Sequence, residues 1–181
     1  TLPLILGFDA DKGAIIATEK NLIAAGLQDL LPLLDIETRA LDKLSATLRP
    51  MVKDGRLSNP LIITNPPYGE RLGEKEELKP TYMELGDWLR PYIGFEAGII
   101  TSEVELGKQM GLRARKVNKF YNGALECVYL QFAIEEQYFV DRKAADSRQE
   151  KRNLEELMSE GGEDFFNRLT KNKKKWEKWA K

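Results

Sequence analysis

The sequence predicts an α/β fold with a mostly parallel sheet that ends in an antiparallel hairpin. Short apolar runs alternate with helix-like segments through the first 110 residues, which is typical of strand–helix–strand units. Two strand-like runs then follow one another around Tyr121-Asn122-Gly123-Ala124, and an Asn-Gly pair in such a place favours a hairpin turn. The length of 181 residues and the hydrophobic content of 42% are enough for a real core.

The first half of the chain predicts three strands and two helices. Residues 2–8 form an apolar run that predicts a buried strand, and Asp11 then stands where a helix N-cap is expected. Ala, Ile and Leu at helical spacing predict a helix over residues 14–25, which Gly26 ends. We expect further strands over residues 30–34 and 60–64, and a helix over residues 41–53.

The second half predicts a helix, a strand, a short helix and the hairpin. Apolar side chains lie on one helix face over residues 81–92, at Tyr82, Leu85, Leu89 and Tyr92. A strand over residues 97–101, a helix over residues 104–110, and hairpin strands over residues 113–120 and 125–134 follow. The pattern then becomes polar and charged. We therefore expect one domain over residues 1–140 and a charged helical linker over residues 141–181.

The chain has no histidine and one cysteine, Cys127, which excludes several kinds of site. Serine–histidine and cysteine–histidine couples, an imidazole general base, histidine-ligated metals and cysteine-cluster zinc sites are ruled out. No apolar run approaches the roughly 18 residues that span a membrane, and no signal peptide opens the sequence. We expect a reduced, cytoplasmic setting with no metal and no membrane. Any chemistry must use carboxylates, amides, hydroxyls, backbone groups or a cofactor.

Charge is spread unevenly along the chain, whose formal net charge is −1. Residues 165–181 carry seven basic side chains and one acidic side chain, so this end is able to contact phosphate. A solvated helix face or a linker explains the same pattern, and charge alone favours that interpretation.

Asn65-Pro66-Pro67-Tyr68 directly follows the third predicted strand, at the end of a sheet where open α/β folds bind ligands. The prolines stiffen the turn and remove two backbone donors, which leaves the Asn65 amide and the Pro66 carbonyl as neighbouring acceptors. Two acceptors suit an exocyclic amino group, and drawing its nitrogen toward tetrahedral geometry raises its nucleophilicity. Tyr68 offers a flat face for a base, and attack on a charged methyl sulfonium needs no prior general base. The alternative, a rigid turn without function, is less consistent with a strand followed by this segment.

Acidic side chains follow the first two predicted strands. Asp9 stands at a strand's carboxyl end, where nucleotide-binding folds use a carboxylate to hold ribose hydroxyls, so we assign Asp9 to a cofactor and Asp11 to the helix cap. Asp35 and Glu37 end the next predicted strand, from which one of them can reach an adenine amino group. We favour Glu37 slightly.

Four segments of the chain resemble the class I S-adenosylmethionine-dependent RNA methyltransferases that are associated with THUMP modules. Gly7-Phe8-Asp9-Ala10-Asp11 is similar to the second motif of class I methyltransferases. Asn65-Pro66-Pro67-Tyr68-Gly69-Glu70-Arg71-Leu72-Gly73 resembles the fourth motif of the THUMP-associated group, and residues 112–127 resemble its terminal hairpin. Residues 164–180 resemble the junction before the second methyltransferase domain of the bifunctional RlmK/L-type enzymes.

The resemblance implies a Rossmann-like class I methyltransferase fold that uses S-adenosyl-L-methionine. The implied reaction is methylation of a guanine exocyclic amine, guanine-N2, in 23S ribosomal RNA, free or in an early large-subunit precursor. By this analogy the residues divide into a catalytic set, Asn65, Pro66 and Tyr68; a cofactor-binding set, Asp9, Glu37 and Asn65; and a substrate-binding set, Pro67, Tyr68 and Arg71. An ordinary surface ion pair is the alternative role of Arg71.

The resemblance also implies a first strand and a Gly-rich loop upstream of Asp9, which the sequence from Thr1 onward does not contain. That strand belongs between residues 2–8 and residues 61–64, so two sheet edges are expected to be unpaired. We expect the isolated chain to be inactive, to bind the cofactor weakly, and either to pair with another chain through these edges or to rearrange.

Two other functions stay open. The Asn-Pro-Pro-Tyr segment alone is shared with DNA adenine-N6 methyltransferases, whose reaction also proceeds from an exocyclic amine. A non-catalytic RNA-binding piece that uses the basic end is the rival from another class.

Overall fold

Two compact units make up the chain, Thr1–Phe139 and Val140–Lys181. The computed structural model describes residues 3–57, 59–67, 74–142, 144, 147–148, 150–153 and 155. In the second unit, the described residues from 142 to 155 are helical. The basic segment 165–181, and the predicted site residues Tyr68 and Arg71, lie outside the described residues.

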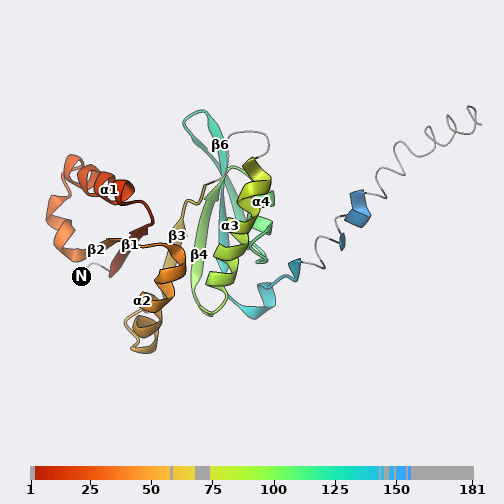
Figure 1. Cartoon of the computed structure of the whole chain (residues 1–181), viewed down its shortest axis with the longest axis horizontal. Helices are drawn as coiled ribbons and strands as arrows, with labels where there is room; N and C mark the ends of the chain where they lie inside the picture. Colours follow the sequence, from red (N-terminus) through yellow and green to blue (C-terminus); the bar gives the residue numbers. More distant parts are fainter. Residues whose placement is uncertain are drawn as a thin grey trace, which may run out of the picture. The chain divides into compact units, whose positions relative to one another are not determined.

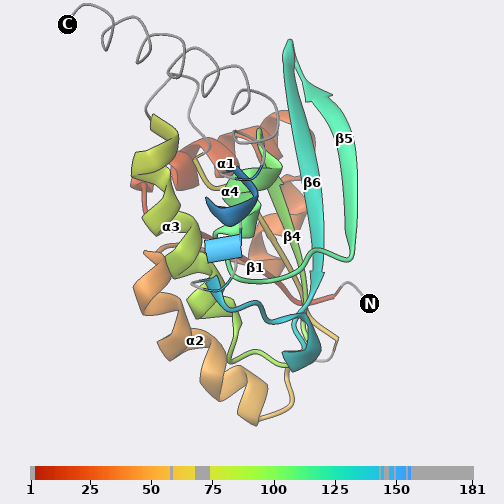
Figure 2. The same cartoon turned by 90° about the vertical axis from the view of Figure 1, so that its right-hand side faces the viewer.

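The described strands of the first unit form two sheets (Figure 1). β1 (Ile5–Asp9) pairs in parallel with β2 (Leu34–Thr38). The other sheet has the order β3-β4-β6-β5, in which β3 (Leu61–Thr64) runs parallel to β4 (Glu96–Thr101). β5 (Lys116–Asn122) and β6 (Leu125–Ala133) form the long antiparallel hairpin at its edge (Figure 2). The predicted α/β fold with a C-terminal hairpin is confirmed.

Helices lie between the successive strands from β1 to β5, as the sequence predicts. They are α1 (Lys12–Ala24), α2 (Leu41–Lys53), α3 (Glu74–Leu89) and the short α4 (Val104–Lys108), with 3₁₀ turns at Gln28–Leu33 and Glu136–Tyr138. The predicted N-cap of α1 is confirmed, because the Gly13 N–H donates to Asp11 Oδ1 at 2.8 Å.

The strand predicted over residues 30–34 is wrong. Gln28–Leu33 is a 3₁₀ helix, and β2 begins only at Leu34. Pro32 has no N–H to donate to a ladder and fixes its own φ in a range that a helical turn accepts, so the apolar run ahead of Leu34 turns instead of extending. As a result, Asp35 and Glu37 lie within β2 and not after it.

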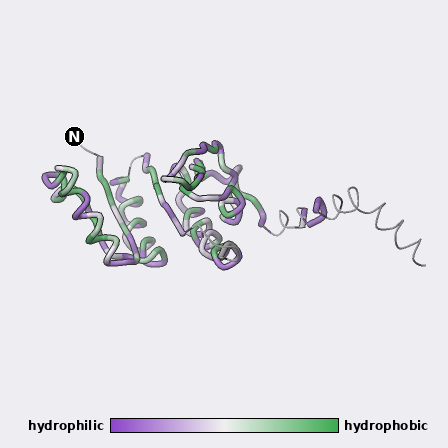
Figure 3. Tube along the Cα trace, turned by 90° about the horizontal axis from the view of Figure 1, so that it is seen from above, coloured by the Kyte–Doolittle hydropathy of each residue, from purple (hydrophilic) through white to green (hydrophobic). Residues whose placement is uncertain are grey.

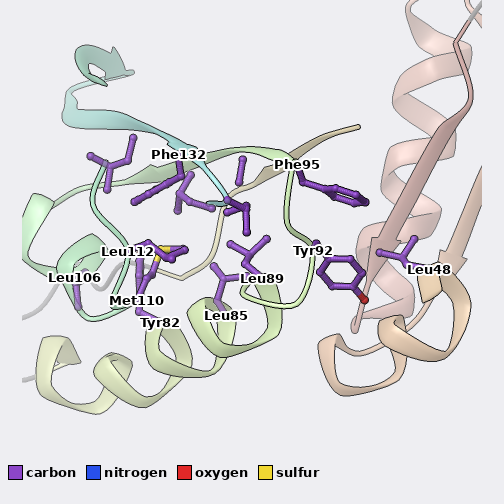
Figure 4. Close-up of a cluster of buried hydrophobic side chains, with 14 of the residues drawn as sticks. Leu48, Tyr82, Leu85, Leu89, Tyr92, Phe95, Leu106, Met110, Leu112 and Phe132 are labelled. Carbon is purple, nitrogen blue, oxygen red and sulfur yellow. The ribbon is translucent and has the colours of Figure 1, made fainter. Parts of the chain in front are cut away.

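One buried cluster joins the helices α2, α3 and α4 to the strands β4 and β6 (Figure 4). Three predicted face residues of α3, Tyr82, Leu85 and Leu89, are buried in it. The Tyr82 hydroxyl donates to Thr101 Oγ1 at 2.9 Å, which satisfies the buried threonine at the end of β4. The cluster therefore fixes the carboxyl end of β4 next to the end of β3, where the candidate site begins.

β1 and β3 are edge strands of two separate sheets, and no ladder joins them within the described residues. Both pack against the same core, β1 through Leu6 and Phe8 and β3 through Ile62. Figure 3 shows β1, the first strand after the N-terminus, as mostly hydrophobic. Leu61 and Ile63 on β3 are each about 60% exposed. The structure thus contains the two unpaired edges that the sequence predicts.

Within the part of the chain that the structure describes, no helical segment has the length and hydropathy of a membrane span. Over the same residues, no group of three or more cysteine, aspartate or glutamate side chains is arranged to hold a metal ion.

Candidate active site

Asn65, Pro66 and Pro67 leave the carboxyl end of β3, which pairs with β4 up to Thr64 opposite Ile99. Pro66 is buried, whereas Asn65 and Pro67 are exposed. The buried proline anchors a stiff turn on the domain, and the Asn65 side chain makes no hydrogen bond with another described residue. The turn therefore holds an amide that is able to bind a ligand, in the place where the sequence predicts it. The predicted neighbours Tyr68 and Arg71 lie outside the described residues.

Asp9 ends β1 and is exposed. Its Oδ1 accepts a hydrogen bond from the backbone N–H of Asp11 at 2.7 Å, and Asp11 in turn caps α1 through Gly13. The two carboxylates thus form a short relay that fixes the turn between β1 and α1. Asp9 therefore stabilises this turn, a role that the sequence does not predict. Its other carboxylate oxygen, Oδ2, makes no hydrogen bond with the described residues.

Glu37 lies on β2 opposite Phe8 of β1, one pair before Asp9 opposite Thr38. Its Oε2 accepts a hydrogen bond from Arg39 Nη2 at 2.5 Å, and its side chain is less than half exposed. Asp35 lies two residues further from the carboxyl end, opposite Leu6. The register therefore brings Glu37, and not Asp35, next to the end of β1.

Arg39 is a residue of this region that sequence reasoning missed. Besides Glu37, its guanidinium contacts α2, where Nη1 donates to Thr47 Oγ1 at 2.7 Å. Its backbone N–H donates to the Asp9 carbonyl oxygen at 2.7 Å. The signal was present in the sequence, because residues two apart on an extended segment share a face and Arg39 follows Glu37 at that spacing.

The structure brings some of the predicted site residues together and keeps others apart. Asp9 and Glu37 lie at neighbouring strand ends of one sheet, and Arg39 contacts both residues. Asn65 and Pro66 follow a strand of the other sheet. Over the described ranges, no hydrogen bond or ion pair joins Asn65 to either carboxylate.

The shifted pKa values that the structure resolves lie away from these residues, on the β5–β6 hairpin. Lys119 Nζ donates to Glu126 Oε1 at 2.7 Å. This hydrogen bond and the attraction between the charges raise the pKa of Lys119 and lower the pKa of Glu126. Both groups are solvent-exposed, so we interpret the pair as a surface ion pair that links the two strands of the hairpin and not as a catalytic pair.

Comparison with known proteins places these features in a family. Residues 1–131 match the model of the RMKL-like methyltransferase domain. The chain is 54% identical to the ribosomal RNA large subunit methyltransferase K/L of Psychrobacter cryohalolentis over its whole length, and 43% identical over 99% of its length to that of Syntrophotalea carbinolica. It spans only 23% of each of these two relatives.

A solved structure agrees with this assignment. A crystal structure of SMU.472, a putative methyltransferase complexed with SAH, superposes with a TM-score of 0.58 at 28% sequence identity. The superposition covers 73% of this chain and 32% of that one. The residues that match the family model, 1–131, include β1 to β5, most of β6, the Asn65 turn and the Asp9 and Glu37 strand ends. Because the model matches more than half of the chain, the chain belongs to the family of RMKL-like methyltransferase domains.

Proposed function

We propose that this chain is part of an enzyme that methylates the exocyclic amine of a guanine, at N2, in 23S ribosomal RNA. One observation carries the proposal: a stiff turn at the carboxyl end of β3 presents the Asn65 amide, which makes no hydrogen bond with another described residue, in a chain whose family is that of RMKL-like methyltransferase domains. The relatives that are named ribosomal RNA large subunit methyltransferases support RNA as the substrate.

The chemistry of the turn fits an amino group on a base. Asn65 Oδ1 and the Pro66 carbonyl oxygen are two acceptors, and an exocyclic amine has two N–H donors. Accepting both hydrogens orients the nitrogen lone pair away from the protein and raises its nucleophilicity. The amine nitrogen loses its proton only after it has attacked the methyl group. The reaction therefore does not require a histidine general base, and the chain contains no histidine. In the same proposal Tyr68 stacks on the target base, and Pro67 and Arg71 contact the RNA.

S-adenosyl-L-methionine is the cofactor, and it supplies an electrophilic methyl group. The described residues fit its adenosine part: Asp9 Oδ2 and Glu37 Oε1 make no hydrogen bond with another described residue, and both belong to carboxylates at adjacent strand ends. Such oxygens accept hydrogen bonds from hydroxyl and amino groups. We assign Asp9 to the ribose hydroxyls and Glu37 to the adenine, with Asn65 at the junction of cofactor and base.

The cofactor carboxylates and the Asn65 turn belong to separate sheets. This separation affects what the 181-residue chain can do without the rest of the protein. Because no described ladder joins β1 to β3, the cofactor carboxylates are held relative to Asn65 only by packing of the two strands on the shared core. We expect the chain alone to bind the cofactor weakly and to be inactive. We also expect copies of it to associate through the β3 edge, where Leu61 and Ile63 are exposed beside unpaired backbone groups.

Substitution of Asn65 in the full-length protein that contains this sequence tests the proposal. Asn65→Ala removes one of two acceptors, and we expect a loss of methyl transfer of roughly 100-fold or more, with RNA affinity unchanged. Asn21→Ala, at an exposed position on α1, is the matched control and retains activity. Full methyl transfer by Asn65→Ala contradicts the proposal. Equal loss of methylation and of RNA binding contradicts the assigned role of Asn65.

A further inference from the structure

Arg39 connects three elements around the candidate cofactor carboxylates. It follows β2 directly, and its guanidinium donates to Glu37 Oε2 at 2.5 Å and to Thr47 Oγ1 of α2 at 2.7 Å. Its backbone N–H donates to the carbonyl oxygen of Asp9 at 2.7 Å, so the same residue also holds the end of β1. One residue thus fixes both acidic strand ends relative to each other.

The bonds of Arg39 fix the direction of the Glu37 carboxylate. Glu37 lies on β2 opposite Phe8, and Asp9 ends β1 opposite Thr38, the residue between Glu37 and Arg39. Arg39 is the cation bonded to Glu37, and its side chain is only one-third exposed, so solvent screens the interaction less than at a fully exposed pair. The guanidinium is planar and its donors point in fixed directions, so a bond from Nη1 to Thr47 also fixes the direction of Nη2 toward Glu37.

We propose that Arg39 is a positioning residue for the cofactor site and acts through Glu37. By holding Oε2 it leaves Oε1 as the acceptor for a ligand, and by holding the Asp9 carbonyl oxygen it keeps the ends of β1 and β2 in register. This inference rests on the proposed function, because it assumes that Glu37 and Asp9 bind the adenosine part of S-adenosylmethionine. Arg39 touches neither the methyl group nor the base, so its effect falls on cofactor affinity and not on the chemical step.

A double-mutant cycle in the full-length protein tests this role. The variants are Arg39→Gln, Glu37→Gln and the double variant, and the measurement is the Kd of S-adenosylmethionine by titration calorimetry. We expect Arg39→Gln to weaken binding about tenfold, and to have almost no further effect once Glu37 is replaced, because the two residues act as one unit. KM for the cofactor should rise in parallel, while kcat at saturating cofactor and KM for RNA change less than about twofold.

A conservative variant and a control variant complete the experiment. Arg39→Lys retains the charge without the forked donors, so we expect an affinity between those of the wild type and Arg39→Gln. It also serves if Arg39→Gln fails to fold. Arg115→Gln is the matched control, because Arg115 pairs with Glu96 at 3.1 Å on the exposed surface of the other sheet, and its removal should leave cofactor affinity unchanged.

The outcomes separate this inference from the function on which it rests. If Glu37→Gln weakens binding and Arg39→Gln does not, or if the two effects add, Arg39 does not position Glu37. If kcat falls while cofactor affinity stays the same, Arg39 acts on another step and the inference is wrong. If neither Glu37→Gln nor Asp9→Asn changes cofactor affinity, the cofactor assignment itself fails and the inference fails with it.

Discussion

Replacement of Gly86 by alanine will destabilise the domain, although alanine is the better helix former. Gly86 lies inside α3, where the exchange alone is worth about 1 kcal/mol in favour of alanine. An alanine Cβ at this position would lie 2.0 Å from the carbonyl oxygen of Met110 and 2.6 Å from its carbonyl carbon. Ordinary carbon–oxygen contacts are about 3.3 Å or longer, so α3 or the chain at Met110 must move by roughly 1.3 Å.

That movement is costly because the obstacle is backbone in a packed region. Met110 is fully buried, and Arg90, the residue directly after α3, donates to the next carbonyl oxygen, that of Gly111, at 2.7 Å. Overpacking of a core costs roughly 1–3 kcal/mol, and a backbone clash lies at the upper end of that range. After subtraction of the helix gain, we expect a net loss in unfolding free energy of about 2 kcal/mol.

Urea unfolding of the 181-residue chain, monitored by far-ultraviolet circular dichroism, measures this loss. The Gly86→Ala variant should unfold with its midpoint at a lower urea concentration than the wild type. Gly13→Ala in the first turn of α1 is the control, since its Cβ would meet only the Asp11 carboxylate, at 3.2 Å. A side-chain oxygen can shift at little cost, so the control should change stability by less than about 1 kcal/mol. A Gly86→Ala variant as stable as the wild type, or more stable, would refute the close packing of α3 on the Met110 segment.

Three other predictions concern the strand ends, the hairpin and the exposed sheet edge. In the full-length protein, Asp11→Ala should cost about 1 kcal/mol of stability in thermal unfolding and leave cofactor affinity intact. Asp9→Asn keeps an acceptor for the turn, so it should leave stability intact and weaken cofactor binding. The stability difference between wild type and Glu126→Gln should be largest near neutral pH. It should vanish as pH falls through the lowered pKa of Glu126, where the carboxylate is protonated, and as pH rises through the raised pKa of Lys119, where the ammonium loses its charge. Ile63→Lys should reduce self-association of the 181-residue chain in sedimentation velocity, whereas Ile23→Lys, at an exposed position on α1, should not.

The features that the sequence predicts well depend on local chemistry. Asp11 caps α1 because its side chain reaches an N–H two residues away, and the hairpin turns at Gly123, whose φ is +64°, a value that glycine adopts freely. The apolar face of α3 is likewise recognisable from spacing within one helix. In each case the residues that decide the structure are neighbours in the chain.

The features that the sequence predicts poorly depend on contacts between distant segments. The apolar run ahead of β2 has the composition of a strand, and only the conformational preference of Pro32 distinguishes it from one. The contact of Arg39 with Thr47 requires α2 to pack next to the end of β2. The hydrophobic pattern of the sequence does not predict how a helix packs against a strand end. The register between β1 and β2, which selects Glu37 over Asp35, is set by packing across the pair and not by either strand alone.

In the function proposed for this chain, Asn65 and Pro66 direct methyl transfer to a guanine amine of ribosomal RNA. The most direct test of this function is nucleoside analysis by mass spectrometry, after the full-length protein has reacted with isotope-labelled S-adenosylmethionine and either unmodified 23S ribosomal RNA or DNA. We expect labelled N2-methylguanosine from the RNA, no labelled product from the DNA, and neither product with Asn65→Ala. Labelled N6-methyladenine from the DNA, or the same guanosine product from Asn65→Ala at the wild-type rate, would contradict the proposed function.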